Sequence, residues 1–170
     1  MLREYDWRVA YREAGSNTSN LPTYEQYLAV ARYSIGGPPH MWAAMITAND
    51  PSTPEHLDHL RGMEQIASMC IRLANDLQSY QKEIGEGNIN ALVILSSDLM
   101  KSGVPADTAL EQAKRRVHAD IGEGLDRLSQ LREAAVSHTG HPEATIDNIA
   151  RFVCDFYAHH DYHTFVGQGA

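Results

Sequence analysis

The sequence lacks the features that mark several classes of protein. It contains only two cysteines, Cys70 and Cys154, each inside an apolar helical pattern, so we expect reduced core thiols rather than a disulfide framework or a cysteine zinc site. It has no Lys/Arg block and a formal net charge of -8, which argues against nucleic-acid or anionic-membrane partners, since both need clustered positive charge. No apolar run reaches the roughly 18 residues of a membrane span, and the charged start lacks the apolar region of a signal peptide. We therefore expect a cytoplasmic protein.

The apolar pattern is helical. Hydrophobic residues make up 43% of the chain, which suffices for the core of a single domain over residues 1–170. Apolar side chains recur at spacings of three and four, and no long stretch alternates with period two. We therefore predict an all-α domain. The expected helices run from Leu2 to Glu13, from a Thr23/Gln26 capping box to a break at Gly36-Gly37-Pro38-Pro39, from His40 to Thr47, from Thr53 to about Glu83, from about Asn90 to Met100, along a stripe from Leu110 to Leu128, and through Ile149 to Tyr157.

Three oxygen-bearing side chains share one face of the longest predicted helix. Asn75, Ser79 and Glu83 are each four residues apart, which places them within an arc of about 80° over roughly 12 Å of helix. Mg²⁺ prefers oxygen ligands and is commonly completed by water and by substrate phosphate oxygens. Lys82, beside Glu83, can add a charge contact to phosphate. The alternative is an ordinary polar helix face, because polar residues at this spacing are common.

The whole string around these residues carries a family resemblance. Residues 75–83 (Asn-Asp-Leu-Gln-Ser-Tyr-Gln-Lys-Glu), followed by the glycine-containing run at 85–91, resemble the Asn/Ser/Glu metal-binding motif of class I terpene synthases, or terpene cyclases, of the bacterial type. The resemblance implies an antiparallel helix bundle of that family's type, with Asn75, Ser79 and Glu83 binding one Mg²⁺. It also implies a lyase that ionises and cyclises a linear prenyl diphosphate, as in sesqui- or diterpene formation, and releases diphosphate.

The break after the second predicted helix is similar to another part of that family. There an arginine senses the diphosphate, and a glycine a turn later presents its carbonyl to the substrate. Arg32, Ile35 and Gly36 have the spacing expected of sensor, linker and effector, and Arg32 lies 43 residues before Asn75. A guanidinium suits bidentate phosphate recognition, and glycine lets the backbone approach a ligand closely. The resemblance thus implies catalytic and substrate-binding roles here. The alternatives are a solvated arginine and a simple helix terminator.

The C-terminal end departs from the family pattern. The family often has an Arg-Tyr pair that reaches the diphosphate, whereas this chain has His159-His160-Asp161-Tyr162-His163. Tyr162 matches the tyrosine and is a candidate substrate-binding residue, but the arginine is missing. A histidine can donate a hydrogen bond to phosphate, and the cluster can also be a transition-metal site. The alternative to both is a polar helix end.

Aromatic and sulfur side chains are candidates for the wall of a carbocation cavity, because their polarisable faces steer positive charge. For any one of them, an ordinary place in the helix-bundle core is the alternative. The candidates are Tyr33, Trp42, Met45, Met69, Phe152 and Phe156.

One expected part of the family's metal site has no counterpart in these residues. The family carries an Asp-Asp-x-x-Asp motif that supplies carboxylates to the other side of the metal cluster, and the 170 residues contain none. We therefore expect the C-terminal half of the family's domain, completed by self-association as a homo-oligomer or by a companion chain that carries the aspartates. A non-catalytic partner, regulatory or truncated module that keeps one metal motif is the alternative. A third possibility is a metal-binding module that uses the C-terminal histidines.

Overall fold

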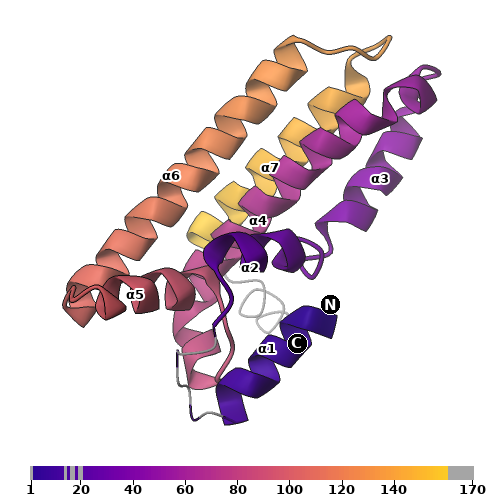
Figure 1. The fold of residues 1–170 in the computed structure, drawn as a ribbon. Coiled ribbons are helices and arrows are strands. Elements are labelled where there is room, and N and C mark those ends of the chain that lie inside the picture. The colour runs from indigo at the N-terminus through magenta and orange to yellow at the C-terminus, as the bar shows by residue number, and fades with distance from the viewer. Residues whose placement is uncertain (1, 14, 16–17, 19–20, 161–170) are drawn as a thin grey trace, which may run out of the picture.

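The fold was analysed in a computed structural model, which describes residues 2–13, 15, 18 and 21–160. In these residues it contains helices and no strand (Figure 1), which confirms the all-α prediction. The helices are α1 (Leu2–Glu13), α2 (Tyr24–Ala31), α3 (Gly37–Ala48), the short 3-10 helix η2 (Thr53–His56), α4 (Leu57–Gly85), α5 (Ala91–Lys101), α6 (Ala106–Glu133) and α7 (His141–His159).

The long helix α4 organises the bundle. Figure 1 shows α3, α4, α6 and α7 running alongside one another, and α4 packs against each of the other three. The shorter helix α5 lies across the end of α6, and α2 contacts α4 and α5. Helix α1 packs on α2. The C-terminal turns of α4 therefore lie near α1, α2 and α5 rather than in the middle of the long-helix bundle.

Local sequence signals explain where α2 and α3 begin. Thr23 Oγ1 accepts a hydrogen bond from the backbone of Gln26 at 3.2 Å, and Gln26 Oε1 accepts one from the backbone of Thr23 at 3.0 Å. This is the predicted capping box. The predicted break at residues 36–39 was wrong in its position, because α2 already ends at Ala31 and α3 begins at Gly37. Pro38 and Pro39 occupy the first turn of α3, where a helix does not need their missing N–H groups.

The ends of α4 also differ slightly from the prediction. Thr53 and Pro54 open the 3-10 helix η2, and α4 starts at Leu57 and continues to Gly85. After the loop, Asn90 caps α5, because its Oδ1 accepts hydrogen bonds from the backbone N–H groups of Leu92 at 2.9 Å and Val93 at 3.1 Å. This cap satisfies donors that the first helical turn leaves free.

The core consists of two clusters of buried side chains, both built on α4. One joins α3, α4, α6 and α7 and includes Met41, Met63 and Ile146. The other joins α2, α4, α5 and α6 and includes Leu73 and Leu92. Both cysteines are free and buried, and burial raises the pKa of each thiol to about 12. In the part of the chain that the structure describes, none of the helices combines the length and apolarity needed to cross a membrane.

Candidate functional site

The predicted metal ligands form a ridge along the last turns of α4. Asn75, Ser79 and Glu83 are all partly buried, and their spacing keeps them on one side of the helix. The Ser79 hydroxyl donates to the backbone carbonyl of Asn75 at 2.8 Å, which leaves the lone pairs of Ser79 Oγ as acceptors. The ridge thus presents an amide oxygen, a hydroxyl oxygen and a carboxylate, a donor set that suits a hard divalent cation.

The carboxylate of Glu83 is oriented from two sides. Asn90 Nδ2 donates to Glu83 Oε2 at 3.0 Å and also lies 3.3 Å from the backbone carbonyl of Asp76. On the other side, Arg72 Nη2 lies 3.9 Å from Glu83 Oε1. Because Asn90 is also the cap of α5, the start of α5 is fixed to the metal-ligand end of α4.

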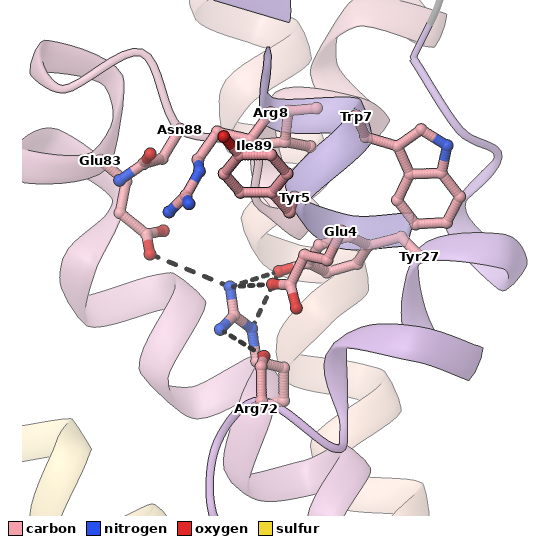
Figure 2. Close-up of a pocket in the computed structure, with 10 residues that line it drawn as sticks. Glu4, Tyr5, Trp7, Arg8, Tyr27, Arg72, Glu83, Asn88 and Ile89 are labelled. Atoms are coloured by element: carbon pink, nitrogen blue, oxygen red, sulfur yellow. Dashed lines mark hydrogen bonds and ion pairs between the residues drawn. The ribbon is translucent and has the colours of Figure 1, made fainter. Parts of the chain in front are cut away.

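A polar cavity of about 510 Å³ opens at this end of α4. Figure 2 shows Glu83 and Arg72 facing side chains of α1 across it. Its wall contains two arginines and two glutamates, so charges of both signs face the same space. The lining residues are Glu4, Tyr5, Trp7 and Arg8 of α1, Tyr27 of α2, Ser34 of the turn between α2 and α3, Arg72 and Glu83 of α4, and Asn88 and Ile89 of the loop after α4.

Arg72 is the buried cation at the base of this cavity, with 7% of its surface exposed. Its Nε lies 2.9 Å from Asp76 Oδ1, and both Nε and Nη2 donate to Tyr27 Oη, at 2.9 and 2.6 Å. Burial alone would lower the pKa of Arg72, but the charges of Asp76 and Glu83 outweigh it and hold that pKa above its ordinary value. Arg72 is therefore a permanent positive charge beside Glu83.

Asp76 completes this network beneath the ridge. Its side chain is fully buried, and Oδ2 accepts hydrogen bonds from Tyr27 Oη at 2.8 Å and from the backbone of Ala91 at 2.9 Å. Burial raises the pKa of Asp76, although Arg72 acts in the opposite direction. The second residue of the motif thus joins α2, α4 and α5 from the inside and does not face the cavity.

The turn between α2 and α3 carries the predicted sensor, linker and effector. Arg32 caps the end of α2, its Nη2 donates to Tyr33 Oη at 2.9 Å, and its guanidinium carbon lies 4.8 Å from the centre of the Tyr33 ring. Arg32 Nε is buried without a hydrogen-bond partner. Gly36 has a φ of 75°, which glycine adopts without strain. Its carbonyl oxygen lies 2.7 Å from His40 Nδ1, so this nitrogen donates, because a carbonyl can only accept.

An apolar cavity of about 460 Å³ lies between this turn, α4 and α7. On α4 it is lined by Ile71, which is four residues before Asn75, so the cavity continues the metal-ligand ridge by one helical turn. Two of the aromatic candidates line it, and two others, Met45 and Trp42, belong to the core cluster around α3 and α4. The lining residues are Ile35, Gly36, Gly37, His40, Ile71, Ile149, Phe152, Val153, Phe156 and Tyr157.

The remaining predicted site residues lie elsewhere. Lys82 is exposed near the end of α4. Tyr162 lies outside the described residues, as do Asp161 and His163 of the histidine cluster. His159 Nδ1 lies 2.9 Å from the backbone carbonyl of Asp155. Within residues 2–13, 15, 18 and 21–160, no three His, Cys, Asp or Glu side chains are grouped so that they could hold a metal ion.

The sequence patterns did not single out Arg72, Asn90 or His40, which the structure places beside the predicted site. Arg72 carries a local signal, since it is a charged residue inside the apolar run of α4 and stands four residues before Asp76, the spacing of a helical ion pair. The contact between His40 and Gly36 also has helical spacing. The bond from Asn90 to Glu83 crosses a loop and has no comparable signal.

Comparison with known proteins places the chain in a family. Residues 1–123 match the family described as terpene synthase family 2, C-terminal metal binding. Because this match covers well over half of the 170 residues, the chain belongs to the terpene synthase family, as its metal motif indicated.

The relatives include plant and bacterial enzymes. The chain is 28% identical over 124 residues to ent-kaurene synthase-like 3 of Oryza sativa subsp. japonica, an alignment that covers 71% of the chain and 15% of the relative. It is 24% identical over 147 residues to the chloroplastic kaurene synthase like 2 of Isodon rubescens, covering 83% and 18%. Pristinol synthase of Streptomyces pristinaespiralis is 25% identical over 169 residues, covering 88% and 43%. The chain thus spans less than half the length of each of these three relatives.

Proposed function

We propose that this chain forms the metal-binding part of a terpene synthase that ionises a linear prenyl diphosphate with Mg²⁺ and cyclises the resulting carbocation. The observation that carries the proposal is the shared face of α4. Glu83 lines the polar cavity and Ile71 lines the apolar one, and Asn75 and Ser79 lie between them on the same helix face. A substrate with a charged head and a hydrocarbon tail needs this combination of walls.

In this proposal, different residues bind the metal ion, orient a metal ligand and bind the diphosphate. Bound Mg²⁺ would neutralise negative charge on the departing diphosphate. Asn75, Ser79 and Glu83 would hold the ion, and Asn90 keeps the Glu83 carboxylate turned toward it. The unpaired Nε of Arg32 is a free donor for a diphosphate oxygen.

The apolar cavity has its own part in the proposal. Its apolar walls would pack against the hydrocarbon, and the carbonyl dipole of Gly36 would stabilise positive charge in the cavity. Lys82 and Tyr162 remain candidate diphosphate ligands from the family resemblance.

Carboxylates for the other side of the metal cluster must come from outside these 170 residues, because the sequence holds no Asp-Asp-x-x-Asp motif. We propose a second copy, a companion chain or a longer form of the chain as their source. The same missing motif favours a second candidate function, a non-catalytic helical partner that binds one cation without ionising substrate.

Turnover separates these two functions. The purified chain is incubated with Mg²⁺ and geranyl, farnesyl or geranylgeranyl diphosphate, and products are analysed by gas chromatography and mass spectrometry. A catalyst releases hydrocarbon or alcohol, and Glu83→Gln abolishes that release while Glu111→Gln, on the exposed face of α6, leaves it intact. No product from any of the three substrates would show that the chain alone is not a catalyst, which supports either the non-catalytic partner or a catalyst that needs carboxylates from another chain.

A further inference from the structure

We propose that Arg72 is a positioning residue that links the Glu83 carboxylate to the turn between α2 and α3. Through this link, cation binding at Glu83 would loosen the turn. The proposal rests on the proposed function in one respect, since it takes Glu83 to be a metal ligand. Its structural basis is a single buried guanidinium that contacts both the metal-ligand end of α4 and the turn that contains Arg32 and Gly36.

The guanidinium is held firmly at its base. Tyr27 Oη accepts from Nε and Nη2, and Asp76 lies on the same side with Oδ1 2.9 Å from Nε. Tyr27 is completely buried and in turn donates to Asp76 Oδ2. These short contacts keep the base of the guanidinium in place, because leaving them would strand charged groups, so that only small shifts among its longer outer contacts remain open to it.

The outer nitrogens of Arg72 reach in two directions. Nη2 lies 3.9 Å from Glu83 Oε1 (Figure 2), on the ridge of predicted metal ligands. Nη1 donates to Ser34 Oγ at 3.4 Å. Ser34 sits between the predicted sensor and effector, and its hydroxyl donates to the Ala31 carbonyl at the end of α2 at 2.8 Å. One side chain therefore connects the metal helix to the turn that carries Arg32.

Cation binding would redistribute these contacts. When Glu83 turns its oxygen to a metal ion, Arg72 loses one of its three outer contacts and keeps those to Glu4 and Ser34. The Glu4 carboxylate of α1, already 3.9 Å from Nη2 (Figure 2), is placed to take over. A guanidinium drawn toward Glu4 weakens its long bond to Ser34 and releases the turn. Once the turn is released, Arg32 can shift with it and bring its unpaired Nε to the diphosphate after the cation is in place, which gives an ordered sequence of binding.

Amide hydrogen exchange in the turn tests this link, including in the absence of metal. The amides of Tyr33 and Ser34 donate to the carbonyls of Val30 and Ala31, so their exchange rates report opening of the turn. Glu83→Gln removes the negative charge that faces Arg72. We expect it to raise both exchange rates about threefold or more, the effect of one weakened hydrogen bond, and to have no effect in an Arg72→Lys background. Lysine keeps the charge but cannot reach all the partners of Arg72 at once.

Three further measurements make the result decisive. Arg151→Lys, which alters an arginine that joins α7 to α6, is the matched control and should leave the response to Glu83→Gln unchanged. Ser34→Ala removes the hydroxyl that accepts from Arg72, together with its bond to Ala31, and should abolish the change that Glu83→Gln causes at the Tyr33 amide relative to Ser34→Ala alone, which keeps the test valid if Arg72→Lys fails to fold. Mg²⁺ added to the wild type should raise the two rates as Glu83→Gln does.

The outcomes separate the link from the metal function. An equal response to Glu83→Gln with and without Arg72, or no response in either background, overturns the proposal. If Mg²⁺ changes nothing and does not bind, the metal function fails, but the comparison between the two backgrounds still decides whether Arg72 links Glu83 to the turn.

Discussion

At the scale of single residues, the surroundings of Arg32 differ from those of a solvated surface arginine. Its Nη2 is fixed by Tyr33, and its Nε is buried with no hydrogen-bond partner. A buried unpaired donor costs free energy unless a ligand satisfies it. The sensor role of Arg32 remains a prediction that pyrophosphate binding can test.

Replacement of Arg32 by lysine should weaken the binding of inorganic pyrophosphate in the presence of Mg²⁺ by about tenfold, because an ammonium group cannot reproduce the forked contact of a guanidinium. Isothermal titration calorimetry measures the affinity. Arg61→Lys, which changes an exposed arginine paired only with Asp58 in the described contacts, serves as the control. Equal affinities for the wild type and Arg32→Lys would remove Arg32 from the site.

The residue-level site could be predicted in part. The common face of Asn75, Ser79 and Glu83 follows from helical periodicity alone, and the structure keeps that face. The partners of Arg72 could not be predicted, because Tyr27 and Ser34 are 45 and 38 residues away in the chain. Contacts of this kind depend on how the helices pack, which no local pattern contains.

At the scale of helices, α4 and α6 approach each other closely at Gly124. A side-chain carbon added at Gly124 would lie 2.4 Å from Cys70 Sγ, so α6 can pack on α4 only if this residue has no side chain. Gly122, two residues earlier on the same helix, has nothing within 4 Å of such a carbon. The two glycines form a matched pair for a test of the packing.

Gly124→Ala should lower the free energy of unfolding by about 1–3 kcal/mol, the usual cost of overfilling a packed core. Gly122→Ala should raise it by about 0.5–1 kcal/mol, because alanine is the better helix former. Urea denaturation followed by circular dichroism measures both. A tolerated alanine at Gly124 would mean that α4 and α6 are farther apart than described.

A second contact between elements depends on one carboxylate. Asp50, just after α3, accepts hydrogen bonds from Ser52 through Oδ1 and from the backbone and hydroxyl of Thr139 through Oδ2, at 2.7 and 2.6 Å. These bonds, those from Ser52 first, lower the pKa of Asp50 below its ordinary value. They join the loop after α3 to the loop between α6 and α7.

The stability that Asp50 contributes should therefore depend on pH. Because the pKa is lower in the folded state, this contribution is complete above the unfolded value of about 3.9 and is lost as the pH falls toward the folded value. Thermal unfolding of the wild type and of Asp50→Asn should differ most near pH 7, and the difference should shrink below about pH 4. A difference that stays constant or grows in acid would show that the ionised carboxylate does not hold the loops together.

The helices themselves were largely predictable, and the errors have physical causes. The capping box of α2 and the apolar stripe of α6 are local signals, and both helices form where the pattern indicates. The Pro38-Pro39 pair is compatible with either a helix break or a helix start, because prolines do both, and only the position of the preceding turn decides between the two. Neither cavity could be predicted, since each is formed by helices distant in sequence.

At the scale of the whole molecule, the chain combines a ridge of predicted metal ligands, a polar cavity and an apolar cavity around the C-terminal half of α4. In the proposed enzyme, the ridge supplies one wall of the diphosphate site, and carboxylates from outside these 170 residues supply the opposite wall. The proposed enzyme therefore requires that the ridge bind a divalent cation.

Binding of Mn²⁺, a stand-in for Mg²⁺ at oxygen ligands, tests this claim most directly. Electron paramagnetic resonance can count bound ions with and without inorganic pyrophosphate, which would complete the coordination. The account predicts one Mn²⁺ that Mg²⁺ displaces, with affinity at least about tenfold weaker in Glu83→Gln and unchanged in Glu111→Gln. Equal Mn²⁺ binding by all three proteins, or none by the wild type under either condition, would contradict it.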